Sequence, residues 1–86
     1  MNRMQLCIAS GAKVLYEGPA DAVFLPGTEG ICELLPGHAP YMTLIRGGDV
    51  RVCCGKEERM FAVEGGVAWN CNNAVSILIF GDNVIK

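Results

Sequence analysis

Short segments in which apolar and polar residues alternate follow one another along most of this chain. Side chains on a β-strand point to opposite faces in turn, so a period of two predicts strands with one buried face. Most of these segments are also rich in β-branched or aromatic residues, which favour strands. We therefore expect strands at residues 4–9, 13–17, 20–25, 41–46, 50–53, 59–63 and 74–80.

Turn-forming residues separate these segments at short intervals and leave almost no room for a helix. Glycine, proline, asparagine and aspartate mark the breaks, among them Ser10-Gly11, Pro26-Gly27, Pro36-Gly37, Gly47-Gly48, Gly65-Gly66 and Asn72-Asn73. Many short strands with regular turns are typical of a sandwich or barrel. We predict an all-β fold, a sandwich or a barrel, with residues 1–86 forming a single domain.

The last predicted strand is apolar on both of its faces. Val75, Ile77 and Ile79 alternate with Ser76, Leu78 and Phe80. Such a strand is expected to be covered on both sides. The core is one cover, and we expect a protein partner to be the other.

Composition supports a chain that works with partners. Hydrophobic residues make up 51% of its 86 residues and charged residues only 19%, against about 25% charged in a typical soluble domain. A domain of this size buries only about 60 to 65% of its unfolded surface. Part of the apolar material should therefore lie in exposed patches of the kind that mark interfaces.

Charge and hydropathy exclude two classes of partner. A net charge of −2 and scattered arginines offer no basic stripe for a phosphate backbone, so we expect no nucleic acid. The strongest apolar run, residues 74–80, is far shorter than the ~20 residues of a membrane-spanning helix, and the start lacks a signal peptide. The five cysteines form no disulfide framework, which favours a reducing compartment.

The segment Pro36-Gly37-His38-Ala39-Pro40, here called the display turn, holds the only histidine. Its prolines fix φ near −65° and its glycine can adopt a positive φ, so the segment should form a stiff turn with His38 at its crest. A turn that is ordered in advance loses little entropy on binding, which favours docking. The alternative is an ordinary connection in which His38 only bonds its own backbone.

Few of the cysteine, serine and histidine residues are spaced as a catalytic or metal site requires. Cys53 and Cys54 are neighbours on a predicted strand, so their thiols point to opposite faces and do not readily share a metal ion. Only Ser10 and Ser76 offer serine hydroxyls to pair with His38. We expect no catalytic, cofactor or metal site. A thiol- or metal-dependent module that uses the cysteines and His38, and a stand-alone β-sandwich binding module, are the alternatives.

Two aromatic residues have both a structural and a functional interpretation. Aromatic side chains dominate binding hot spots, and they also fill small cores. We expect Phe61 in the core, while both interpretations stay open for Trp69.

A set of spaced motifs resembles the N-terminal domain of the ε subunit of F-type ATP synthases, from about residue 6 to residue 78. The Pro-Gly-His-Ala-Pro block is a specific signal for this family when Gly-x-Glu-Gly precedes it and a Gly-Gly pair follows it at these distances. The matching residues are Leu25-Pro26-Gly27-Thr28-Glu29-Gly30, Leu34-Leu35 with the display turn, Thr43, Ile45, Gly48, Val50-Arg51-Val52 and Phe61-Ala62-Val63-Glu64-Gly65-Gly66.

The resemblance implies a ten-stranded β-sandwich at the foot of a central stalk. Such a domain packs against the γ subunit and rests on the membrane-embedded c-ring. It is a non-catalytic part of the rotor, and it couples ion-driven rotation to ATP synthesis. The implied location is the cytoplasmic face of a bacterial inner membrane, peripheral and held there only through the complex.

The resemblance also implies roles for individual residues. On the c-ring side it places Glu29, Ile31, Pro36, Gly37, His38, Ala39 and Pro40, and at structural turns Gly27, Gly30, Gly48, Gly65 and Gly66. Gly30-Ile31-Cys32-Glu33-Leu34 departs from the family's usual Gly-Glu-Leu-Gly-Ile, so an acidic side chain has moved. The family's C-terminal helical hairpin, which serves inhibition and in some members ATP binding, is not in this chain, and we expect a naturally short subunit.

Overall fold

The computed structural model describes residues 3–11, 13–37 and 39–80, and most of them lie in strands. One hydrogen-bonded sheet forms in the order β2-β1-β7-β6-β5-β3-β4, in which only the β1–β7 pair is parallel. The all-β prediction is confirmed. The strands are β1 (Met4–Ser10), β2 (Lys13–Ala20), β3 (Ala22–Gly27), β4 (Gly30–Leu34), β5 (Tyr41–Cys54), β6 (Glu57–Cys71) and β7 (Ala74–Ile79).

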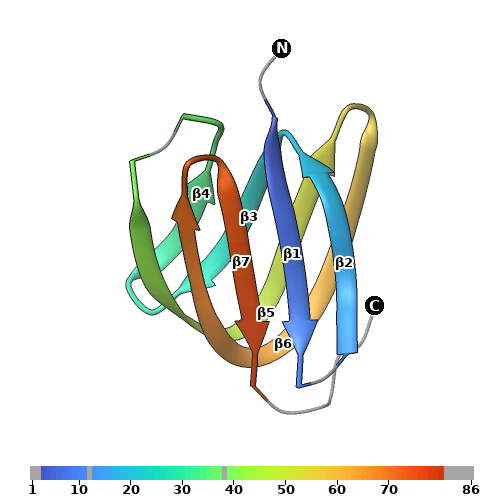
Figure 1. The fold of residues 1–86 in the computed structure, drawn as a ribbon. Coiled ribbons are helices and arrows are strands. Elements are labelled where there is room, and N and C mark those ends of the chain that lie inside the picture. The colour runs from blue at the N-terminus through green and yellow to red at the C-terminus, as the bar shows by residue number, and fades with distance from the viewer. Residues whose placement is uncertain (1–2, 12, 38, 81–86) are drawn as a thin grey trace.

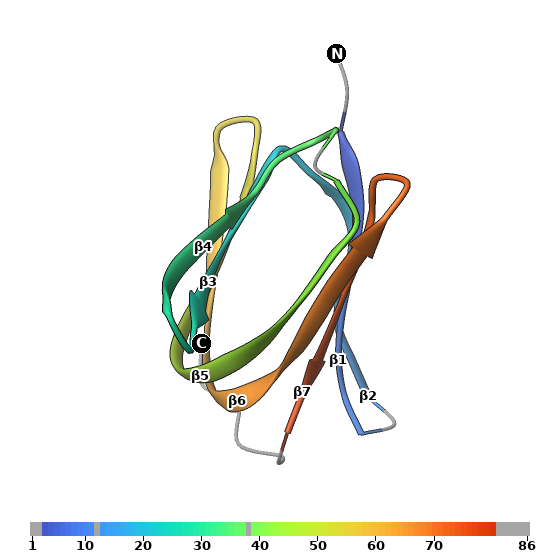
Figure 2. The ribbon, with the colours of Figure 1, turned by 90° about the vertical axis from the view of Figure 1, so that its left-hand side faces the viewer.

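This sheet folds back on itself into two layers, as Figures 1 and 2 show. Strand β7 pairs with residues 66–71 of β6, and those residues pair with the first part of β5. On the other side, β3 pairs with β4 and mainly with the second half of β5. The five-stranded layer is thus β2, β1, β7 and the two half-strands 66–71 and 41–45. The four-stranded layer is β4, β3 and the half-strands 48–54 and 57–64.

The described residues form seven strands, whereas the resemblance implied ten for the domain. Residues 41–46 and 50–53, expected as separate strands, form one 14-residue strand, β5. Likewise residues 59–63 are part of the 15-residue β6. The turns expected at Gly48, Gly65 and Gly66 are bends within these long strands, which pair with each other along both layers.

Glycine is needed at the bend because the backbones approach each other closely there. Gly48 and Gly65 both have φ of 155°, a backbone conformation that residues with a side chain rarely adopt. At Gly66 a Cβ atom would overlap the carbonyl oxygen of Leu78 and lie 3.1 Å from Cα of Ile79. The bend therefore brings β6 against β7 at a distance that only a residue without a side chain permits.

The core fills the space between the layers with the inward residues of both. Phe61 is 2% exposed, as predicted, and its ring meets that of Tyr16 edge to face with centroids 6.4 Å apart. In β7, Val75, Ile77 and Ile79 are all buried. The other buried apolar residues are Met4, Leu6, Ile8, Ala20, Val23, Leu25, Leu34, Ile45, Val50, Val52, Val63 and Ala68.

One carboxylate joins three segments at the end of the sandwich where the β5–β6 hairpin lies. Asp21, between β2 and β3, accepts a 2.6 Å hydrogen bond from the Gly55 amide at that hairpin. Its other oxygen accepts a 2.8 Å bond from Nε of Arg3, just before β1. The Gly55 amide, and after it the Arg3 guanidinium, lower the pKa of Asp21 below its usual range.

The close approach at Gly66 predicts a large stability loss on adding one methyl group. Gly66→Ala should lower the free energy of unfolding by about 1 to 3 kcal/mol, because the β6–β7 ladder must open to admit the methyl group. Gly18→Ala is the matched control, since its Cβ would meet only Tyr16 ring and hydroxyl atoms at 3.7 Å or more. Urea unfolding of both variants measures the difference, and equal midpoints would contradict the close approach.

The bonds to Asp21 predict how stability changes in acid. A carboxyl whose pKa is lower in the folded state stabilises the fold above its unfolded pKa of about 3.9 and ceases to do so as pH falls through the folded value. Asp21→Asn should therefore lower stability at neutral pH and weaken its decline below about pH 4. Urea midpoints between pH 2 and 7 measure this, with Asp49→Asn, at an exposed aspartate of β5, as the control. Parallel curves for wild type and Asp21→Asn would refute it.

Candidate docking surfaces

The outward face of the five-stranded layer carries two rows of mostly apolar side chains. In each row the residues are cross-strand partners that run from β5 through β6 and β7 to β1. None of the eight is charged. We call this set the outer face: Met42, Trp69, Ser76 and Cys7 in the first row, and Leu44, Val67, Leu78 and Ala9 in the second.

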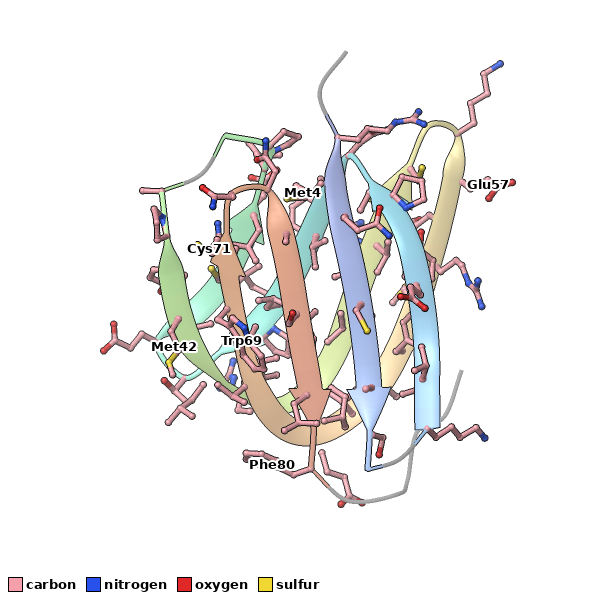
Figure 3. All side chains as sticks on the ribbon, in the orientation of Figure 1. Met4, Met42, Glu57, Trp69, Cys71 and Phe80 are labelled. Atoms are coloured by element: carbon pink, nitrogen blue, oxygen red, sulfur yellow. The ribbon has the colours of Figure 1, made fainter. Side chains whose placement is uncertain are left out.

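The large side chains of the outer face are open to solvent. Met42 is 67% exposed, Leu44 58%, Trp69 41% and Leu78 39%. Figure 3 labels Met42 and Trp69 on β5 and β6, with Phe80 beyond the end of β7. Phe80 is itself 54% exposed. These residues form a contiguous apolar surface of the kind that marks a protein interface. Trp69, left open by the sequence, belongs to this surface.

The opposite face of the sandwich differs in charge. On the four-stranded layer the Arg51 guanidinium lies 4.4 Å from the ring centroid of Phe24 and donates a 3.0 Å hydrogen bond to Glu58. Arg59 shares the alternation of buried Phe61 and Val63 on β6, so it belongs to the inward side, 5.5 Å from the ring centroid of Tyr16. Arg51 thus already contacts an aromatic and an acidic neighbour of its own chain. The two faces are therefore chemically distinct, and the outer face is the apolar one.

The display turn connects β4 to β5 beside the β6–β7 hairpin. Gly37 has φ of 83°, which fits the Pro-Gly pair of a type II turn and confirms the positive φ that the sequence predicted. The Gly37 amide donates a 2.7 Å hydrogen bond to Oδ1 of Asn73, and Nδ2 of Asn70 donates a 3.2 Å bond to the carbonyl of Ala39. Pro36 is half-buried and Pro40 exposed. His38 lies outside the described residues.

Glu29 and Ile31 lie at the other end of β4 from the display turn. Glu29 is in the turn between Gly27 and Gly30, which are themselves paired, and Ile31 is 74% exposed. Residues 27–32 and 41–44 line an open depression of about 470 Å³. The structure therefore brings Glu29 and Ile31 close to the Met42 and Leu44 end of the outer face, and it places Pro36, Gly37, Ala39 and Pro40 in a second group.

The five cysteines are free thiols, and only Cys71 is exposed. Cys53 and Cys54 are consecutive in β5, where alternation turns them to opposite faces. Among the residues that the structure describes, no three His, Cys, Asp or Glu side chains gather as metal ligands would. Nor does any helix in those ranges have the length and hydropathy needed to cross a membrane.

A comparison with protein families identifies the fold's family. Residues 3–80 match the model of the β-sandwich domain of the ATP synthase delta/epsilon chain. The chain belongs to this family. The resemblance inferred from the display turn and its flanking motifs is confirmed.

Relatives in bacteria carry the name ATP synthase epsilon chain. The protein of Leptospira interrogans is 34% identical over 77 residues, which cover 90% of this chain and 61% of the relative. That of a Cyanothece species is 43% identical over 67 residues, covering 78% of this chain and 49% of the relative. The chain thus spans about half to three-fifths of the length of these curated relatives.

Solved structures share the fold at low sequence identity. A chain in the mitochondrial ATP synthase of Euglena gracilis, in an assembly of OSCP, F1 and c-ring, superposes with a TM-score of 0.86 at 20% identity, covering 96% of this chain and 52% of that one. A chain from the central stalk and c-ring of the Tetrahymena thermophila enzyme gives 0.79 at 11% identity, with 99% and 67% covered. At these identities the likeness establishes the fold of the family's β-sandwich.

Sequence reasoning named some of these surface residues and missed others. Met42 and Leu44 belong to a predicted strand, and their alternation with buried Ile45 was a usable signal for an outward apolar pair. Asn73 belongs to the predicted Asn72-Asn73 turn, whereas Asn70 was not singled out by any sequence pattern. No sequence signal links them to the display turn, because the bonded residues are 31 and 36 positions apart.

Proposed function

We propose that this chain is an ε-type subunit of the central stalk of an F-type ATP synthase and a part of its rotor. It docks on the γ subunit and on the c-ring, and it couples ion-driven rotation to ATP synthesis. Membership of the delta/epsilon family supports the complex, and the uncovered outer face supports the docking. The chain works at the cytoplasmic face of a bacterial inner membrane and is held there through the complex.

The outer face is the surface we assign to the γ subunit. The exposed surface of the chain is 5141 Å², and a standard interface takes about 800 Å² from each partner, or roughly a sixth of this total. The two rows of the outer face span four neighbouring strands and contain no charge that would have to be desolvated without a partner. A broad, apolar and rigid sheet face favours a permanent contact with another subunit over transient association.

The display turn is the surface we assign to the c-ring, together with Glu29 and Ile31. These residues lie on the side of the sandwich where, among the described residues, no further strand pairs with the outer edge of β4 or with most of the first half of β5. Gly37, Ala39 and Pro40 are exposed there, and Glu29 offers an acidic group. A turn that is already held in one conformation loses little entropy when a partner binds, which favours docking here.

The chain carries out no catalysis in this proposal. The depression beside Glu29 is open rather than enclosed. Enzyme sites place a nucleophile and a base within hydrogen-bond reach in a concave pocket. The outer face and the display turn instead offer shape and contact area, which is what a coupling subunit contributes.

Paired substitutions on opposite faces of the sandwich test this assignment. Met42→Glu on the outer face should weaken binding to purified γ by about tenfold or more, because the interface would bury an unpaired charge. Met60→Glu is the matched control, since Met60 is 48% exposed on the four-stranded layer. Both substitutions sit at exposed positions, so both variants should fold normally.

Calorimetry or pull-down with γ gives the affinities, and circular dichroism checks the folds. Equal weakening by the two variants would remove the outer face as the docking surface. Failure of the wild-type chain to bind γ would refute the proposed function as a whole.

A further inference from the structure

Two asparagine side chains grip the display turn on either side of position 38. The Oδ1 atom of Asn73 accepts a 2.7 Å hydrogen bond from the Gly37 amide, and Nδ2 of Asn70 donates a 3.2 Å bond to the Ala39 carbonyl. We propose that Asn70 and Asn73 are positioning residues, which hold the turn in the conformation that docks. The proposal rests on the proposed function, in which this turn meets the c-ring.

The main chains of both asparagines are held by the sheet. Asn70 is 4% exposed and belongs to β6, where it pairs with Val75 of β7. Asn73 lies in the hairpin between these strands. Its main-chain oxygen accepts a 2.8 Å hydrogen bond from the main-chain amide of Gln5 in β1. The turn is thus held by groups that the sheet itself keeps in place.

The two bonds act where the turn is least constrained by its own covalent structure. Pro36 and Pro40 have fixed φ angles, whereas Gly37 has the widest conformational choice of any residue type. Asn73 bonds the amide of that glycine while its φ is 83°. A turn whose glycine is already held loses less entropy when a partner binds.

Asn73 uses the oxygen of its side-chain amide and Asn70 uses the nitrogen, so different substitutions remove the two bonds. Asn73 acts as an acceptor, so Asn73→Asp keeps the bond and Asn73→Gly removes it. Asn73 has φ of 63°, a conformation that both aspartate and glycine tolerate. Asn70 acts as a donor, so Asn70→Leu removes its bond without placing a carboxylate in a buried site.

The first readout is amide hydrogen exchange of the isolated chain, followed by NMR. The Gly37 amide should be protected in the wild type and in Asn73→Asp, and should exchange about fivefold faster or more in Asn73→Gly. The Gln5 amide is the internal control, because its acceptor is the main chain of Asn73 and survives both substitutions. Unchanged Gly37 protection in Asn73→Gly would overturn the proposal.

The second readout is association with an ATP synthase assembly from which the ε-type subunit has been removed. Asn73→Gly and Asn70→Leu should each bind about fivefold more weakly than the wild type, and Asn73→Asp should bind as the wild type does. Equal affinity of all four chains would refute the positioning role. Failure of the wild-type chain to associate would instead refute the proposed function, and the exchange data would still decide whether the asparagines order the turn.

Discussion

Strands β5 and β6 must bend sharply for this chain to close into two layers, and the bend depends on glycine. The two strands run side by side through both layers, so a single crossing point carries the whole sheet from one to the other. At that point Gly66 lies against the backbone of Leu78 and Ile79 with no space for a side chain. A core between the layers, and with it a rigid outer face, exists only because the backbones can approach there.

The bend also divides each long strand between two chemical environments. The first half of β5 gives Met42 and Leu44 to the outer face, while its second half places Arg51 on the opposite layer beside Phe24 and Glu58. The outer face is therefore uncharged and exposed, while Arg51 on the opposite layer is paired within the chain. A large exposed apolar patch of this kind marks an interaction surface.

Much of this arrangement could be predicted from alternation and turn residues, since these depend on local geometry. β1 and β7, buried Phe61, and the positive φ of Gly37 all followed from patterns within a few residues. β4 was not predicted, because its Ile31 faces solvent and so the apolar residues of that segment do not alternate with polar ones. The continuity of β5 and β6 through their glycines, and the reach of Asn73 to Gly37, depend on tertiary packing that no local pattern records.

If a partner covers the outer face, Trp69 must leave water on binding. Its signal is unambiguous because Trp69 is the only tryptophan in the chain. A chain labelled with 5-fluorotryptophan gives one ¹⁹F resonance from a ring that is 41% exposed when the chain is free. On adding unlabelled γ subunit, that resonance should move and lose its sensitivity to the solvent isotope as the ring leaves water. A stable complex in which the Trp69 resonance keeps its position and its solvent sensitivity would contradict the account.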